Sequence, residues 1–117
     1  MAFRLSRGVS GGMGIGGICG AVTGSFLVLG LWVGDGMEER QARYRTYDLV
    51  REFVKEFQRR RGTILCTDLL NGVDISTPEG REEAERRRLF VDVCPAYVED
   101  AAEILEMIMG RKEGESP

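Results

Sequence analysis

The sequence contains no histidine, and this absence removes most hydrolytic chemistry from consideration. Serine–histidine–aspartate triads, cysteine–histidine pairs and histidine-rich zinc sites all require an imidazole ring. Carboxylates are numerous, but they show no spacing that singles out an acid–base pair, and a solvated helix surface accounts for them. Side-chain chemistry in this protein must therefore rest on sulfur or carboxylate groups.

Cysteine is scarce, with only Cys19, Cys66 and Cys94 in 117 residues. An odd number of widely spaced cysteines, without a convincing secretory signal, is not the pattern of a disulfide scaffold. We therefore expect reduced thiols and a cytoplasmic protein.

The sequence also lacks a basic face. The formal net charge is −3, and the two arginine runs at residues 59–61 and 86–88 are interleaved with acidic residues. Binding to nucleic acid needs clustered positive charge that displaces counterions from phosphates. This pattern argues against a nucleic-acid partner.

No hydrophobic run is long enough for a confident membrane span. Residues 8–34 carry no charged side chain. Arg4 and Arg7 precede this stretch, and Asp35 follows it. Within this stretch only residues 25–33 are densely apolar, which is about half of what a bilayer requires. We expect no membrane span, and membrane association through residues 9–34 remains an alternative.

The segment before residue 37 is instead rich in glycine. Gly12, Gly16, Gly20 and Gly24 recur at every fourth position, which on a helix would form one bare stripe. Glycine costs a helix up to about 1 kcal/mol relative to alanine, so such a stripe indicates close packing against another backbone or a bulky group. Cys19 lies at the edge of this stripe and would face the same contact.

Four further patterns predict helices. Residues 37–61 form a long amphipathic pattern whose apolar stripe is Tyr47, Val50, Val54 and Phe57, flanked by Phe53, and which Gly62 ends. A short helix over residues 64–70 follows Thr63, and another opens at Ser76, Thr77 and Pro78. A last helix starts near Cys94 and buries Tyr97, Ala101, Ile104, Leu105 and Ile108.

Together these patterns predict one all-α domain over residues 1–117. We expect a small antiparallel bundle of four or five helices with a glycine-rich first helix. Residues 1–13 are expected to be irregular, and residues 111–117 to form a frayed tail.

Cys94 precedes Pro95 and is predicted to cap the last helix. The positive end of a helix dipole favours a thiolate, so Cys94 would be the attacking group in any thiol–disulfide exchange.

A nucleotide site at Gly12, Gly14 and Gly17, with Asp35 as the ribose ligand, is disfavoured because no strand precedes these glycines.

Three motifs in sequence order carry a family resemblance. They are GGMGIGGICGAVTGSFLVLGL, then ILCTDLL, then CPAYVEDAAEIL. They resemble the C_GCAxxG_C_C family of redox-active proteins, which is related to the iron–sulfur part of split-Soret cytochromes. Cys19, Cys66 and Cys94 match the family's second, third and fourth cysteines, and Gly20, Ala21 and Gly24 complete the glycine tract.

The resemblance implies a four-thiolate site, and its first cysteine has no counterpart here. In the family that cysteine lies on a helix upstream of the glycine tract, which this sequence lacks or which a different start codon would restore. The expected cofactor is an iron–sulfur cluster or another thiolate-bound metal, held by an incomplete ligand set. The lost helix would also leave an apolar patch that a homodimer could cover.

Two functions follow from these patterns. In the first, Cys19, Cys66 and Cys94 serve as thiolate ligands or redox thiols in electron transfer with an unidentified redox partner, and Gly20, Ala21 and Gly24 let backbone and cofactor approach. In the second, the chain is a non-catalytic helical interaction module. The sequence does not decide whether the protein is an enzyme.

Overall fold

The computed structural model describes residue 4 and residues 6–115, with side chains described as far as residue 111. In this part of the chain the elements are η1 (Gly12–Gly16), α2 (Gly20–Val33), α3 (Glu39–Arg61), α4 (Cys66–Leu69), α5 (Pro78–Arg86), α6 (Leu89–Asp92) and α7 (Cys94–Glu115). The predicted all-α class is confirmed. Helix α7 continues into the segment for which the sequence suggested fraying.

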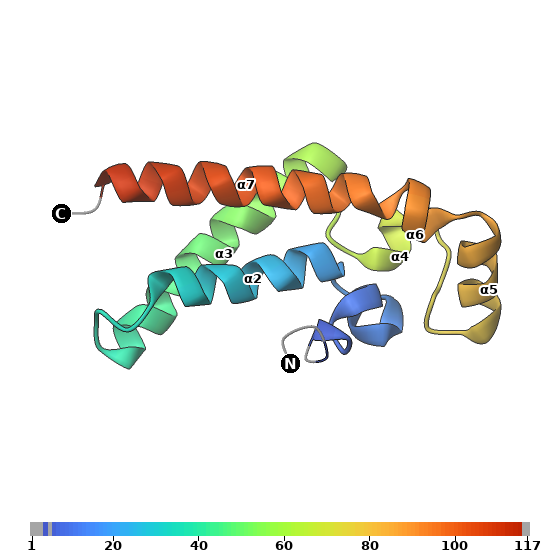
Figure 1. Cartoon of the computed structure of the whole chain (residues 1–117), viewed down its shortest axis with the longest axis horizontal. Helices are drawn as coiled ribbons and strands as arrows, with labels where there is room; N and C mark the ends of the chain where they lie inside the picture. The colour runs from blue at the N-terminus through green and yellow to red at the C-terminus, as the bar shows by residue number, and fades with distance from the viewer. Residues whose placement is uncertain (1–3, 5, 116–117) are drawn as a thin grey trace.

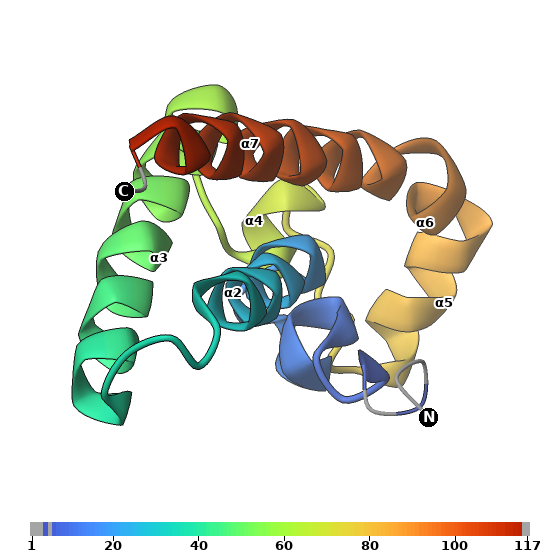
Figure 2. The ribbon, with the colours of Figure 1, turned by 60° about the vertical axis from the view of Figure 1, so that its left-hand side comes forward.

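Three long helices form the main body (Figure 1). Helix α3 runs back against α2, and α7 runs back against α3, while α4, α5 and α6 gather at the start of α7. Figure 2 shows α2 in the middle, with α3 and α7 on two of its sides. The molecule measures 51 × 28 × 20 Å, so it is long and flat rather than spherical.

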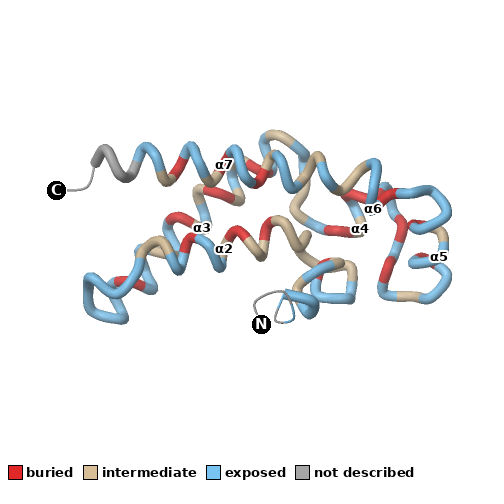
Figure 3. The backbone as a smooth tube through the Cα atoms, viewed as in Figure 1, coloured by how far each residue is buried: buried red, intermediate tan, exposed pale blue. Residues whose placement is uncertain are grey.

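The interior consists of two apolar clusters. The larger apolar cluster joins α2, α3, α4 and α7, and its buried members are Val22, Leu29, Leu49, Phe53, Phe57, Leu69, Ala101, Ile104 and Ile108. The smaller apolar cluster lies around α4, α5 and α6, and its buried members are Cys66, Leu70, Val73, Ile75, Ala84 and Leu89. Figure 3 shows buried backbone in both regions.

The glycine tract does not form the continuous helix that its spacing predicts. Gly12 and Gly16 have φ values of 62° and 70°, in the left-handed region, and Met13 shares that conformation. Residues 17–19 are not helical, and they separate these two glycines from Gly20 and Gly24, which lie in α2. The single glycine stripe is therefore wrong, because half of its members are used for left-handed turns rather than for a bare helix face.

Helix α3 has the predicted length but a different buried face. Its buried residues are Ala42, Leu49, Phe53 and Phe57, whereas Tyr47 is 56% exposed. Phe53 stacks on Phe57 and meets Phe26 of α2 edge to face, so the contact with α2 fixes the rotation of the helix. The prediction that Tyr47 lies on the buried face is wrong, because the buried face of α3 is rotated by part of a turn from the predicted one.

The end of α3 and the start of α5 agree with the sequence. Gly62 ends α3 at a φ of 82°, and the Thr77 hydroxyl accepts a hydrogen bond from Gly80 N at 3.0 Å at the start of α5. The predicted apolar face of α7 is confirmed, with Ala101, Ile104 and Ile108 buried. Charged groups tie α3 to α7, since Asp100 pairs with both Arg60 and Arg61.

Candidate functional site

A single antiparallel backbone bridge places Cys19 beside Cys66. Ile18 pairs with Leu65, Cys19 N donates to Ile64 O at 2.7 Å, and Cys66 N donates to Gly17 O at 2.6 Å. Side chains alternate between the two faces of such a pairing, so both cysteines project from the face opposite Ile18 and Leu65. Diagonal neighbours of this kind lie about 7–8 Å apart in a regular antiparallel pair.

The bridge also sets the starts of two helices. Cys19 is the residue just before α2, and Cys66 is the first residue of α4. Thr63 supports this start, because its hydroxyl accepts a hydrogen bond from Leu65 N at 3.1 Å and donates one to Asp68 at 3.0 Å. Two of the three cysteines therefore leave the bridge directly into helices.

Cys94 joins the other two from α7. It packs against the smaller apolar cluster, to which Cys66 belongs, while Cys19 packs against the larger one. All three are free thiols, with Cys66 buried and the other two partly buried. The three thiols thus gather where the two apolar clusters meet.

Electrostatics supports this grouping. Burial, followed by the charges of Cys19, Cys94 and Asp74, raises the pKa of the Cys66 thiol to about 11. Burial likewise raises the pKa of Cys94, with a second contribution from Cys19. The energy of interaction between two charges falls with their separation, so these mutual contributions to the pKa arise between nearby thiols.

The expected activation of Cys94 by a helix start is not found. Cys94 is the first residue of α7 rather than its cap, and burial, followed by the charge of Cys19, raises the pKa of its thiol. Desolvation disfavours a thiolate. Cys94 is therefore a protonated thiol at neutral pH.

The three remaining predicted site residues follow Cys19 along α2. A Cβ atom at Gly20 would lie 3.1 Å from Ser10 Cα and 3.2 Å from Val9 O, so its missing side chain does allow a close backbone approach. Ala21 packs against the larger apolar cluster. Gly24 has no atom within 4 Å of its Cβ position and faces open space instead.

Sequence reasoning missed two residues near the thiols. Tyr97 donates its hydroxyl hydrogen to Leu69 O at 2.6 Å, and the Arg61 guanidinium lies 5.0 Å from its ring centre. Burial raises the pKa of Tyr97, which Arg61 opposes, and the charges of Cys94 and Cys19 contribute. The sequence spacing could have indicated Tyr97, because it follows Cys94 by three residues and so lies on the same helix face.

Asp74 is the second missed residue, and it adds negative charge near Cys66. Hydrogen bonds from the side chain and backbone of Ser76 lower its own pKa, so it stays ionised at neutral pH. The sequence showed only a turn at this place. Nothing in its local pattern could connect Asp74 to a cysteine.

A single metal ion needs closely spaced ligands. Zinc–sulfur bonds of about 2.3 Å place the sulfurs of a tetrahedral site about 4 Å apart. Within the described ranges, residue 4 and residues 6–111, no group of three or more cysteine, aspartate or glutamate side chains is placed to hold an ion. The same part of the chain contains no helix long and apolar enough to cross a bilayer.

The described fold and site define a small all-α protein with grouped cysteine thiols. Residues 1–108 match the family model described as "Putative redox-active protein (C_GCAxxG_C_C)". The chain therefore belongs to the C_GCAxxG_C_C family, as its three motifs suggested. No curated protein and no solved structure matches it.

Proposed function

We propose that this protein transfers electrons through an iron–sulfur cluster bound by Cys19, Cys66 and Cys94. The observation that supports this proposal is the bridge between Ile18 and Leu65, which holds two of the thiols on one face and near the third. Its family is described as redox-active, and cysteine is the redox-capable residue common to all three motifs.

The spacing of the thiols favours a cluster over the alternatives. A disulfide needs Cα atoms within about 7 Å, and diagonal neighbours stand at or beyond this limit. A single ion needs sulfurs closer together than the described groups provide. A cluster is itself several ångströms wide, so its thiolate ligands lie farther apart than those of one ion.

The charges of the site favour a cation as well. Three thiolates near one another repel, which contributes to the raised pKa of Cys66. Ligands must lose their protons when a metal binds, so binding at this site is expected to release protons at neutral pH. A bound cluster supplies one-electron chemistry, which the protein's own side chains lack.

The protein's part is to hold and shield the thiols. The two apolar clusters keep water from Cys66, which is 7% exposed, and a dry environment shifts a reduction potential. Iron–sulfur clusters normally take four ligands, and this sequence has three cysteines. The fourth ligand would be an oxygen ligand, a small thiol, a group from a second subunit or a residue that this sequence does not include.

Anaerobic purification tests the proposal. We expect stoichiometric iron and acid-labile sulfide, a visible charge-transfer spectrum, and loss of both in Cys19→Ser, Cys66→Ser and Cys94→Ser. Thr63→Ala is the matched control, because it removes the hydrogen bonds at the start of α4 but no sulfur, and it should retain iron. A folded protein without iron or sulfide after anaerobic reconstitution would contradict the cluster.

A further inference from the structure

Helix α2 exposes an apolar face that nothing in the described chain covers. Leu31 is 84% exposed, Leu27 is 65% exposed and Val28 is 40% exposed. These residues lie on the side of α2 opposite Val22, Ser25 and Leu29, which are buried against α3 and α7. Figure 3 shows exposed and buried segments alternating along this helix.

The exposed face has a raised part and a recessed part. Leu27 and Leu31 are one turn apart and project from the surface, while Gly24 lies one turn before Leu27 on the same side. No atom lies within 4 Å of a Cβ placed at Gly24, so this position is an open notch. The notch begins where the packing of Val9 and Ser10 over Gly20 ends.

We propose that this face binds the same face of a second copy, with the two α2 helices antiparallel. If the two-fold axis passes between Leu27 and Val28, Leu31 of each copy lies opposite Gly24 of the other. Leu27 then lies opposite Val28 in both halves of the contact. A two-fold interface requires such self-complementarity, since each surface meets its own copy.

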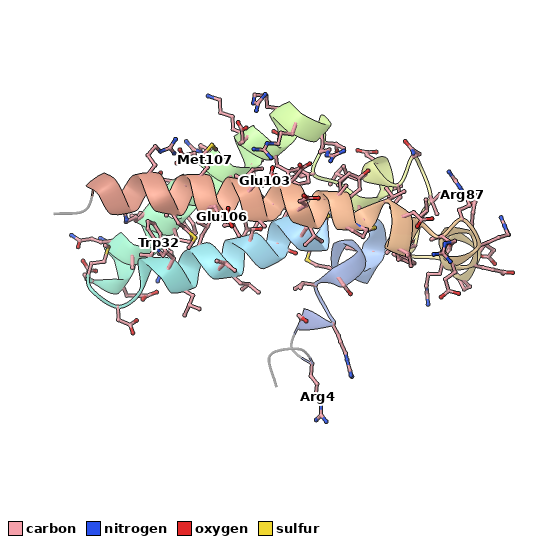
Figure 4. All side chains as sticks on the ribbon, turned by 45° about the horizontal axis from the view of Figure 1, so that its top comes forward. Arg4, Trp32, Arg87, Glu103, Glu106 and Met107 are labelled. Carbon is pink, nitrogen blue, oxygen red and sulfur yellow. The ribbon has the colours of Figure 1, made fainter. Side chains whose placement is uncertain are left out.

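The charges at the two ends of α2 favour the antiparallel direction. Arg4 and Arg7 precede the helix, whereas Asp35 and Glu38 follow it. An antiparallel pair brings the basic end of each copy to the acidic end of the other, while a parallel pair would bring like charges together. Figure 4 shows Arg4 extending away from the helical body at that end.

The contact is small, so we expect a weak dimer. The face involves one uncharged helix of 14 residues, and interfaces of limited area associate transiently. The wild-type chain is expected to pass from monomer to dimer between about 1 and about 100 µM in sedimentation experiments. This inference does not depend on the proposed cluster, and metal-free protein should behave in the same way.

Two substitutions test the shape of the interface. Leu31→Glu places a charge on the most exposed residue and should weaken dimerisation by about tenfold or more. Gly24→Leu fills the notch and should also weaken the dimer, yet it should raise the melting temperature because leucine favours a helix more than glycine does. Val91→Glu is the matched control, because Val91 is 60% exposed on α6 and should leave dimerisation unchanged.

Three outcomes would overturn the proposal. The first is a monomeric wild-type chain up to about 100 µM. The second is a dimer that Gly24→Leu leaves intact or strengthens. The third is that Gly24→Leu increases binding to neutral phosphatidylcholine vesicles while no dimer forms, which would identify the face as a lipid-binding surface.

Discussion

Cys19 and Cys66 are diagonal neighbours across one antiparallel backbone bridge, although 46 residues separate them in the sequence. Their proximity is therefore set by two main-chain hydrogen bonds rather than by side-chain packing alone. Because each thiol is held from the backbone, conservative changes at either cysteine should alter the other's chemistry without moving the chain.

The pH dependence of alkylation tests this coupling. In the metal-free protein, Cys66 should react with iodoacetamide with a midpoint near pH 11, because burial is the main cause that raises its pKa to about 11. Cys19→Ser removes one neighbouring charge and should lower this midpoint, which should still exceed the ordinary value of 9.0. Peptide mapping by mass spectrometry measures each site separately, and a midpoint near 9 in the wild type would contradict the burial.

Alkaline stability provides a second test of the same thiol. The folded-state pKa of Cys66 is raised, so between about pH 9 and pH 11 the folded protein keeps a proton that the unfolded chain loses. The free energy of unfolding should therefore fall as pH rises through this window. Chemical denaturation of metal-free Cys66→Ser should show a smaller fall over the same range, and an equal fall would show that other groups cause it.

The corrected face of α3 can be checked by a pair of substitutions. Phe53 is fully buried between Phe26 and Phe57, so Phe53→Ala should cost about 3–5 kcal/mol of unfolding free energy. Tyr47 is exposed, and Tyr47→Ala should change the free energy by no more than about 0.5 kcal/mol. Comparable losses for both in urea denaturation would restore the face that the sequence suggested.

The glycine tract allows a comparison between two left-handed positions. Gly16 and Gly14 have φ values of 70° and 74°, so alanine at either should cost about 1–2 kcal/mol. At Gly16 a Cβ atom would also collide with the Thr67 hydroxyl, whereas nothing lies near Gly14. Gly16→Ala should therefore be the more destabilising by thermal melting, and Gly16→Ala with Thr67→Ala should recover part of the difference.

Sequence periodicity was sufficient where a helix buries one face against a single surface. It placed α7 with its buried residues Ala101, Ile104 and Ile108, and Gly62 located the end of α3. It failed for Tyr47 because two rotations of α3 bury similar numbers of apolar residues, and only the contact with Phe26 chooses between them. The rotation of α3 depends on its contact with another helix, so the local sequence pattern of α3 does not contain this information.

The candidate site shows the same division. The three motifs identified Cys19, Cys66 and Cys94, and the structure brings them into one region. The bridge between Ile18 and Leu65 could not be foreseen, because residues so far apart form no periodic signal. The glycine spacing of four was also ambiguous, since it suits both a helix face and a run of left-handed turns.

The bridge has a further consequence for the order of folding. Pairing Ile18 with Leu65 closes a loop that contains all of α2 and α3, and closing a long loop costs chain entropy before any contact compensates for it. Contacts between α2 and α3 join segments that are closer in sequence, and they reduce the length of flexible chain that the bridge must close. These contacts should therefore form first. During folding, Cys19 and Cys66 would therefore stay apart until the two helices have docked, and their convergence would mark a late event.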